Sequence, residues 1–409
     1  MTNPPHPQPD TLPSLDDELL IGGRKLSLLR SRAGRTPFFA YDRKGICERT
    51  DLVRRSLPER FHLYYAIKAN PMPALVAHMR SIVDGFDVAS GNELRLALDS
   101  GMTPSNISFA GPAKSIGEIR AAIAAGTCIN CESFSEITQV RKTAEALAEP
   151  ARVAIRVNPN FTLKSAGMQM GGIPTPFGID ASNAAEALRQ VLASELSLEG
   201  IHIYTGSQSL DAAALSETLC SSIRLGLDLA DSAGTELRTL NIGGGFGIPY
   251  FANEKPLALA QVGDALSTFL EHESRLSGST KLILELGRYL VGECGFYVCE
   301  VVDIKQSHGE TFIVVDGGMH HHLANSGNFG QVFRRNFPIV VGTRMTKPLS
   351  QIANINGPSC TPLDKLAEGI QLPAVAIGDL VVVLQSGAYG LTASPNGFLS
   401  QPAAVEILV

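Results

Sequence analysis

Several residues that can carry chemistry stand at the ends of apolar, strand-like runs. Lys68 ends the run HLYYAIK, Asp87 lies near the end of GFDVAS, and three glycines, Gly243–Gly245, stand where LRTLNIGG ends. Glu285 and Arg288 stand around the end of KLILELG. A lysine amine can form an imine, a glycine loop lets backbone N–H groups approach a phosphate, and a carboxylate can keep a heterocyclic nitrogen protonated. Each residue taken singly is more commonly structural; only their common position at strand ends indicates a site.

The spacing of the apolar runs predicts the elements that bring these residues together. The strand-like runs lie at 62–68, 85–90, 106–111, 127–132, 152–158, 198–206, 237–244 and 281–287. Amphipathic, helical stretches follow these runs, and examples lie at 92–101, 115–126, 134–149, 182–195, 211–233 and 257–275. Eight such repeats predict a closed (β/α)₈ barrel of the TIM type rather than an open doubly wound sheet. In a barrel, the carboxyl ends of the strands share one rim, where active sites lie.

The pattern changes after residue 288. The later runs are rich in β-branched residues and are broken by Gly and Pro, which predicts an all-β domain of sandwich or barrel-like form over 289–409. Residues 1–36 precede the first barrel repeat and are expected to pack with that domain. The barrel would then comprise 37–288, and the fold class would be α/β with a second, all-β domain.

Composition limits the classes of protein. A chain of 409 residues is long enough for two domains, and its net charge of −6 argues against a nucleic-acid surface. No apolar run reaches the roughly 20 residues that span a bilayer, and the Pro-rich start lacks the features of a signal peptide. We therefore expect a cytoplasmic protein that binds neither nucleic acid nor membrane, with its 7 cysteines as free thiols.

Two clusters resemble metal ligands only superficially. Cys128 and Cys131 form a single C-x-x-C, and His320, His321 and His322 stand in a row. Neither cluster has a second ligand pair at zinc spacing, so no metal is predicted. The thiols are expected to be buried, and the histidines to be structural or to face substrate.

One ligand, pyridoxal phosphate (PLP), would use all of the rim residues. Lys68 would form an imine with its aldehyde, and Glu285 would pair with its ring nitrogen. The glycine loop, with Ser207 and Arg288, would bind its phosphate. A protonated ring is a strong electron sink, which decarboxylation of an amino acid requires because a carbanion develops at Cα.

The motifs resemble a known family. Cys360 lies in the loop GPSCTPLD of the later domain, and Tyr389 lies in SGAYG. In the order YAIKANP, GGGFG, ELGR, GPSC and SGAY, the motifs resemble the fold type III PLP-dependent decarboxylases, the family of diaminopimelate, ornithine and arginine decarboxylases. The resemblance runs from residue 38 to about residue 390. It implies a PLP-binding barrel, a β domain and a homodimer with shared active sites.

The resemblance also implies roles by position. Lys68 and Glu285 would be catalytic, and Cys360 would reach into the partner's active site and help to protonate the product. The positions that would bind or surround the cofactor are Lys68, Asp87, Arg156, Tyr204, Ser207, Gly243, Gly244, Gly245, Glu285, Gly287, Arg288 and Tyr389.

Three positions depart from the family pattern. Tyr204 stands where a ring-stacking histidine is usual, with His202 two residues earlier, so either ring could stack on the cofactor. Leu286 replaces a proline, which is a mild change. Thr361 follows Cys360 where relatives that take diamino acids carry an acid for the distal ammonium. A neutral threonine favours a substrate without that ammonium.

The stretch 316–338 and the C-terminal motifs resemble one branch of the family. That branch includes exosortase-associated decarboxylases and enzymes that act on glutamate tethered to an acyl carrier protein. Arg334, Arg335 and Thr361 would then contact the substrate, and the arginines would meet a carboxylate or the phosphate of a carrier's phosphopantetheine. The alternative for the two arginines is a solvated basic pair.

Other functions are alternatives on sequence alone. The same reaction could use a free diamino acid such as meso-diaminopimelate, ornithine or lysine. Racemisation would share the barrel and the lysine, but alanine racemase pairs the ring nitrogen with arginine, so Glu285 argues against it. Lys68, Glu285 and Cys360 together argue against a non-catalytic homologue that regulates a partner.

Overall fold

The structure, a computed structural model, describes residues 12–251, 253–327 and 334–409. The chain divides into two compact units. The barrel unit comprises Arg49–Ile248 and Pro256–Tyr289, and the β unit comprises the residues up to Glu48, Pro249–Lys255 and Leu290–Val409. No described helix is long and apolar enough to cross a membrane.

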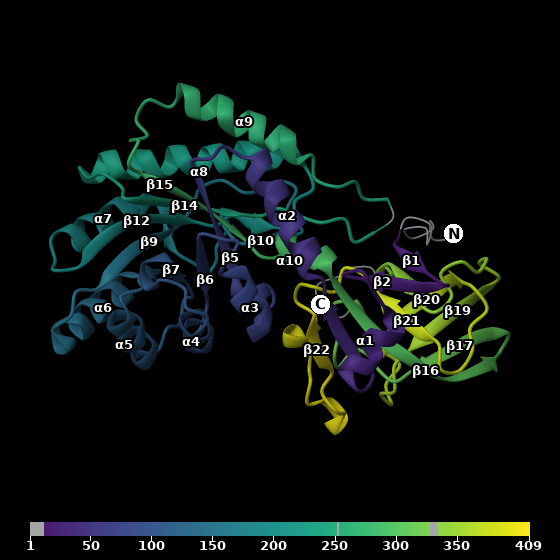
Figure 1. The fold of residues 1–409 in the computed structure, drawn as a ribbon. Helices are drawn as coiled ribbons and strands as arrows, with labels where there is room; N and C mark the ends of the chain where they lie inside the picture. Colours follow the sequence, from purple (N-terminus) through teal and green to yellow (C-terminus); the bar gives the residue numbers. More distant parts are fainter. Residues whose placement is uncertain (1–11, 252, 328–333) are drawn as a thin grey trace. The chain divides into compact units, whose positions relative to one another are not determined.

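Parallel strands form a closed barrel in the barrel unit (Figure 1). The strands are β5 (Phe61–Ala66), β6 (Gly85–Val88), β7 (Ile107–Phe109), β8 (Cys128–Cys131), β9 (Arg152–Asn158), β12 (Ser197–Ile203), β14 (Thr239–Gly244) and β15 (Lys281–Leu286). Each pairs with the next, and β15 pairs with β5 to close the sheet. The short strand β11 (Ile179–Asp180) pairs with β9, and β10 (Met168–Gln169) pairs with β13 (Gly206–Ser207). The predicted barrel is confirmed, because every predicted run overlaps one of its strands.

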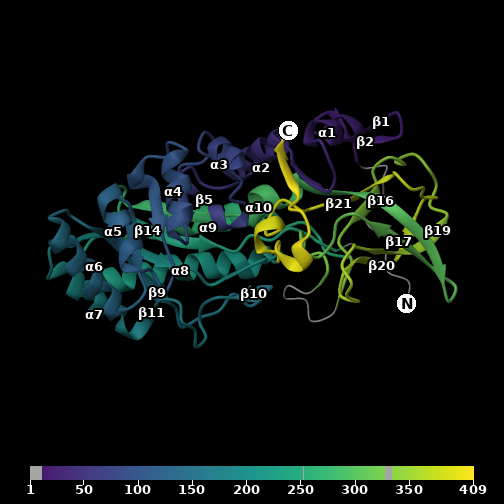
Figure 2. The same ribbon diagram turned by 90° about the horizontal axis from the view of Figure 1, so that it is seen from below.

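Helices pack around the outside of the barrel, as Figure 2 shows for α4, α5 and α6, which contact one another in chain order. The helices are α2 (Arg43–Ser56), α3 (Pro73–Met79), α4 (Gly91–Asp99), α5 (Ile116–Ala125), α6 (Phe134–Leu147), α7 (Ala181–Leu192), α8 (Ala212–Ala233), α9 (Leu259–His272) and α10 (Arg288–Val291). Ser90, Ser115, Ser133 and Asp211 begin helices by accepting backbone N–H groups of the first turn. Helix α3 was not predicted; Pro73 begins it, and it has only 7 residues.

The β unit is mostly antiparallel sheet. Its elements are β1 (Ser14–Leu15), β2 (Glu18–Ile21), β3 (Arg24–Lys25), α1 (Leu26–Ala33), β4 (Phe38–Tyr41), β16 (Gly295–Ser307), β17 (Glu310–Val315), β18 (Ile339–Val341), β19 (Gln351–Asn356), β20 (Lys365–Leu372), β21 (Leu380–Val383) and β22 (Val405–Leu408). The long strand β16 pairs with β4 and β21 along its first part and with β17 along its second. Strands β19 and β20 were not predicted, because their apolar residues are interrupted by polar ones.

The N-terminal segment is part of the β unit. Leu19, Leu26 and Leu29 are buried in one core cluster with Val298 and Val340. Strand β4 pairs with both β16 and β22. The chain therefore leaves this unit at Glu48, later than the expected boundary at 36/37, because β4 is a strand of this sheet and not of the barrel.

Candidate active site on the barrel rim

Lys68 lies in a short 3₁₀ turn directly after β5. Its Nζ donates to Oδ2 of Asp87 at 2.8 Å, and 38% of its side chain is exposed, whereas the side chain of Asp87 is fully buried. Burial and the charge of Glu285 raise the pKa of Asp87, although Lys68 opposes this effect. Oδ1 of Asp87 is buried and makes no hydrogen bond within the described residues. The rim therefore presents an accessible amine next to a carboxylate that has one free acceptor.

Tyr204 and His202 take different places. The ring centre of Tyr204, just after β12, lies 5.8 Å from Nζ of Lys68. His202 lies within β12, is buried, and has its Nε2 at 3.2 Å from Oε2 of Glu285. Of the two rings, Tyr204 is therefore the one that faces the lysine, and His202 faces the buried acid.

Glu285 is a buried carboxylate near the end of β15. Its Oε1 accepts a hydrogen bond from Nδ2 of Asn241 at 2.5 Å. Burial alone would raise the pKa of Glu285, but His202, Lys68 and Asn241 together lower it to about 2. An acid that is ionised at neutral pH is what a protonated pyridine nitrogen requires as a partner.

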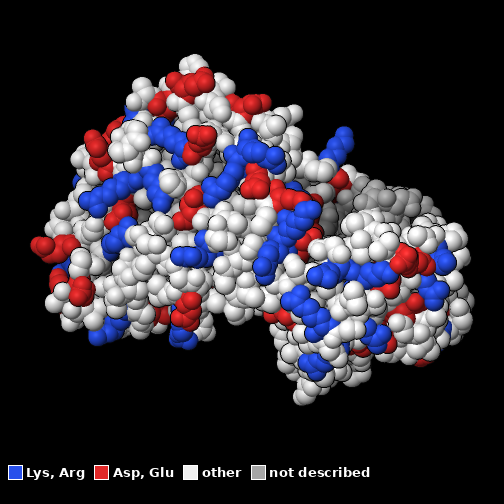
Figure 3. Space-filling view, in the orientation of Figure 1, with Lys and Arg blue, Asp and Glu red and all other residues white. Residues whose placement is uncertain are grey.

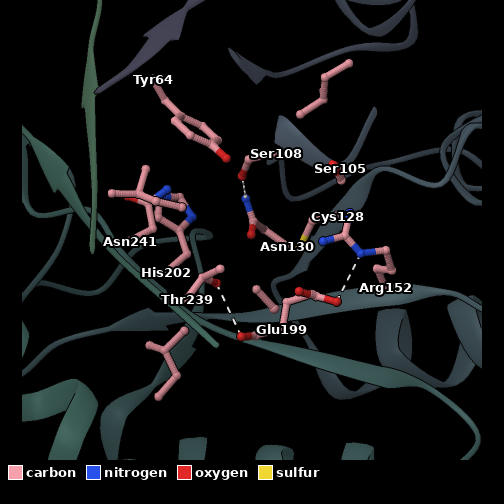
Figure 4. A pocket seen from close by; sticks show the side chains of 14 residues that line it. Tyr64, Ser105, Ser108, Cys128, Asn130, Arg152, Glu199, His202, Thr239 and Asn241 are labelled. Carbon is pink, nitrogen blue, oxygen red and sulfur yellow. Dashed lines mark hydrogen bonds and ion pairs between the residues drawn. The ribbon is translucent and has the colours of Figure 1, made fainter. Parts of the chain in front are cut away.

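The turn Gly243–Gly245 has a backbone that only glycine fits. Gly243 and Gly245 have φ values of +70° and +93°, and a Cβ on Gly244 would lie 2.1 Å from the backbone oxygen of Glu285. Oδ1 of Asn241 accepts from the N–H of Gly243 at 2.9 Å, while its Nδ2 donates to Glu285. Figure 4 shows Asn241 beside His202. Asn241 therefore ties the glycine turn to the buried acid.

Ser207 and Arg288 follow the sixth and the eighth barrel strand. Ser207 belongs to β13, which pairs with β10, so its loop is ordered by backbone hydrogen bonds. Arg288 begins α10 directly after Gly287, where a Cβ would lie 2.8 Å from Cβ of Ala69. Gly287 thus allows the chain after β15 to approach the chain that carries Lys68.

Arg156 is held by Glu132, an acid that the sequence pattern does not single out. Its Nη1 donates to Oε1 of buried Glu132 at 2.8 Å, and its guanidinium lies 5.1 Å from the ring centre of Phe177. Glu132 also accepts from the N–H groups of Gly111 at 2.6 Å and Gly178 at 3.1 Å. The only sequence signal for Glu132 is an acid at the end of a buried strand.

A buried ion pair supports Glu132 in turn. Nζ of Lys114 donates to Oε1 of Glu136 at 2.9 Å, and Oε2 of Glu136 accepts from the N–H of Glu132 at 2.7 Å. Lys114 also donates to the backbone oxygens of Gly111 and Asn130. All three ammonium hydrogens are thus used, which a buried lysine needs.

The remaining candidates belong to the β unit. Cys360 is exposed in the loop between β19 and β20. Buried Asp364 orders this loop, because its carboxylate accepts from the N–H groups of Met319 at 2.6 Å and Ser359 at 2.8 Å. Tyr389 is half-buried with φ +53°, a conformation that indicates a constrained turn. The roles of Cys360 and Tyr389 in the site stay predictions.

Arg334 is used within the β unit. Its guanidinium donates to the carboxylate of Glu368 at 3.0 Å and to Oδ1 of Asn336 at 3.1 Å. It also donates to the backbone oxygens of Lys365 and Ser326, each at 3.1 Å. This arrangement differs from both expectations, a substrate contact and a solvated pair, because four partners in the same unit hold the guanidinium.

Arg335 has a more open arrangement. Its guanidinium lies 3.5 Å from the ring centre of Phe251, and its Nη1 lies 3.4 Å from Oε1 of Glu254. Its side chain is 51% exposed. Arg335 therefore stays a candidate for a substrate contact.

His320, His321 and His322 are all buried in the β unit. Nδ1 of His321 lies 3.1 Å from the hydroxyl of Tyr297, and Nε2 of His322 lies 3.0 Å from Oγ of Ser386. Burial lowers the pKa of His321 to about 4 and that of His322 to about 3, so both rings are neutral at physiological pH.

The rim residues fit pyridoxal phosphate. Lys68 supplies an accessible amine, Glu285 an ionised partner for the ring nitrogen, and the turn Gly243–Gly245 a backbone suited to a phosphate. Oδ1 of Asp87 adds a buried acceptor that no described residue uses.

Comparison with known proteins places the chain in a family. The family model described as pyridoxal-dependent decarboxylase, pyridoxal binding domain, matches residues 43–292. The chain belongs to the pyridoxal-dependent decarboxylases. It is therefore a PLP-dependent amino-acid decarboxylase, and the family resemblance of its motifs is confirmed.

Relatives of this decarboxylase align over most of its length. It is 38% identical to the L-glutamyl-[BtrI acyl-carrier protein] decarboxylase of Niallia circulans, over 91% of this chain and 88% of that protein. It is 33% identical to the diaminopimelate decarboxylase of Aquifex aeolicus, over 96% of this chain and 91% of that protein. Among solved structures, the diaminopimelate decarboxylase of M. jannaschii in complex with L-lysine matches with a TM-score of 0.89 at 26% identity, covering 98% of this chain and 93% of that one.

Proposed function

We propose that this decarboxylase acts on an L-amino acid whose distal end is not a free ammonium, such as a glutamyl group tethered to an acyl carrier protein. The similarity to the carrier-protein glutamyl decarboxylase supports this choice. The observation that carries it is the composition and geometry of the loop 357–364, which holds Cys360.

This loop offers no acid to a substrate ammonium. Thr361 stands next to Cys360, and its hydroxyl accepts from the N–H of Leu363 at 3.3 Å. The one acid of the loop, Asp364, is buried and accepts from two backbone N–H groups. A free diamino acid would therefore lack the charge-assisted bond that its distal ammonium needs from this loop.

The proposed roles of the rim residues follow from their contacts. PLP, when bound, supplies the electron sink for breaking the bond between Cα and the carboxylate. Lys68 binds the aldehyde and moves protons at its Nζ, with Asp87 as the adjacent acceptor. Glu285 would keep the ring nitrogen protonated, and Tyr204, which lies beside Lys68, would be the aromatic neighbour of the cofactor. The turn Gly243–Gly245 would bind the phosphate, together with Ser207 and Arg288. The family resemblance also assigns Tyr389 to the phosphate and Cys360 to protonation of the product.

We also propose a homodimer with shared active sites in the cytoplasm. The exposure of Cys360 on an ordered loop supports this assembly, because a residue that serves the partner's site must be accessible on its own subunit.

The substrate is tested by carbon dioxide release from purified enzyme and PLP. The candidates are glutamyl-carrier protein, free glutamate, lysine, ornithine and meso-diaminopimelate. We expect the tethered substrate to give the highest kcat/KM. Faster turnover of a free diamino acid would contradict the proposal and favour the diaminopimelate-type activity instead.

A further inference from the structure

His202 holds a central position without a complete set of hydrogen bonds. It is 2% exposed, and its Nε2 lies 3.2 Å from Oε2 of Glu285. Neither ring nitrogen makes a well-oriented hydrogen bond within the described residues. A buried imidazole needs a partner for each nitrogen, because a buried polar group without one loses the hydrogen bonds that water would give it.

A small cavity in the barrel interior borders this ring. Its volume is about 30 Å³, and its lining includes His202, Tyr64, Ser108 and Asn130. Figure 4 shows these side chains around one space. The interior of a TIM-type barrel is usually filled by Val, Ile and Leu, so polar residues at these places are unusual. A cavity of this size has room for one or two water molecules.

Two hydroxyl groups of the lining have hydrogens to donate. The hydroxyl of Tyr64 accepts from Nζ of Lys281 at 3.2 Å, and Oγ of Ser108 accepts from Nδ2 of Asn130 at 2.7 Å. Neither hydroxyl donates to another described residue. Burial raises the pKa of Tyr64, so its phenol keeps its proton. One water can accept from both hydroxyls and donate to a ring nitrogen of His202.

We propose that this cavity holds ordered water, which hydrogen-bonds to Nδ1 of His202 and links it to Tyr64 and Ser108. A polar cavity that is large enough for water and offers two to four partners is hydrated, whereas an apolar one of similar size stays dry. The proposal needs no cofactor, because every group that it uses is part of the barrel unit.

The proposed water determines which nitrogen of His202 carries the hydrogen next to Glu285. If Nδ1 accepts from water, the ring hydrogen stays on Nε2, which lies 3.2 Å from Oε2 of Glu285. His202 then acts as a positioning residue that keeps an N–H group next to the acid. This consequence rests on the proposed role of Glu285, whereas the water itself does not.

A crystal structure of the cofactor-free protein at high resolution tests the water. We expect one or two ordered waters between His202, Tyr64 and Ser108, and no xenon in this cavity after xenon pressurisation. An empty cavity, or one that takes up xenon, would overturn the proposal. Lack of decarboxylase activity would leave this result unchanged, so the two proposals fail separately.

The ¹⁵N resonances of the His202 ring show which of its two nitrogens carries the hydrogen. In protein labelled with ¹⁵N-histidine, assigned with His202→Gln, we expect a proton on Nε2 and a hydrogen-bonded, unprotonated Nδ1. The variant Ser108→Val places apolar atoms in the cavity. It should change the ratio of the Nε2–H and Nδ1–H forms of His202, and it should weaken PLP binding several-fold. Cys128→Ala alters the same lining without removing a strong donor, and should leave both unchanged. A proton on Nδ1 of wild-type His202 would refute the assigned role.

Discussion

The barrel unit and the β unit hold their candidate residues in different ways. On the barrel rim, Asp87 and Glu285 are buried and are held by Lys68, Asn241 and neighbouring strands. In the β unit, Cys360 stands exposed on a loop. Rigid, buried placement suits the chemistry of the cofactor, which is common to the family, whereas loops can change from one relative to the next. We infer that the barrel determines the reaction and the β unit determines the substrate.

The largest effect is expected at the barrel lysine. Lys68→Ala should lower kcat by ~10³-fold or more, because the change removes both the covalent attachment and a positioned proton carrier. It should also abolish the visible absorbance band of bound PLP. Lys164, whose side chain is 77% exposed, provides the control, and Lys164→Ala should behave as wild type. Normal turnover by Lys68→Ala would show that Lys68 does not take part in the reaction.

A smaller but still large loss is expected at the buried acid. Glu285→Gln should lower kcat by about 10²-fold, because a neutral amide cannot keep the ring nitrogen protonated. PLP should still bind, since Lys68 and the glycine turn are untouched, and absorbance of bound PLP measures this. If kcat were unchanged while KM rose, Glu285 would serve binding alone.

A change of substrate preference is expected in the β unit. Thr361→Asp should raise kcat/KM for lysine or meso-diaminopimelate about tenfold, because a charge-assisted hydrogen bond contributes roughly 1.5–3 kcal/mol. Thr361→Ser keeps the hydroxyl and should keep the wild-type preference. If the ratio of kcat/KM for the diamino acid to kcat/KM for the tethered substrate were the same in wild type and both variants, this loop would not recognise the distal end of the substrate.

Mixing two inactive variants tests the proposed homodimer with shared active sites. Lys68→Ala and Cys360→Ala are each expected to be impaired, but an equal mixture, after exchange of subunits, should recover about a quarter of wild-type activity, because about half of the dimers then contain one intact site. Activity of the mixture equal to the mean of the two variants would mean that each subunit completes its own site.

The smallest effect concerns stability in acid. The folded pKa of His322 is lowered from 6.5 to about 3 by burial, so the unfolded chain binds the proton first. The stability contributed by the neutral ring is complete above about pH 6.5 and is lost as the pH falls. Wild type should therefore lose more free energy of unfolding between about pH 7 and about pH 5 than His322→Gln does. Urea denaturation measures this, and parallel losses would place the acid sensitivity elsewhere.

Local patterns predicted much of the fold. The eight barrel strands follow from their apolar runs, and their ends predicted where Lys68 and Glu285 lie. Helix α3 is too short for a periodic pattern, and β19 and β20 alternate weakly. Strand β4 was assigned to the barrel, because the residues near it in the sequence do not indicate that it pairs with β16 and β22.

The contacts within the site were less predictable. Strands β14 and β15 pair with a shift in register that brings Gly244 opposite Glu285, and Asn241 of β14 donates to this acid. Such a shift leaves no trace in a single strand. Arg334 was expected to contact the substrate or to be solvated, but its guanidinium is held by residues that include Glu368 and Lys365, more than 30 positions along the chain. The contacts within the site therefore depend on pairing between strands and between distant residues, which the spacing of residues in the sequence does not show.

Borohydride reduction of the enzyme loaded with PLP, followed by peptide mapping, shows directly whether Lys68 holds the cofactor as an imine. Reduction fixes the cofactor to the amine that holds it. We expect a pyridoxyl group on Lys68 and on no other lysine. A label on another lysine, or none after reduction of a PLP-saturated sample, would contradict it.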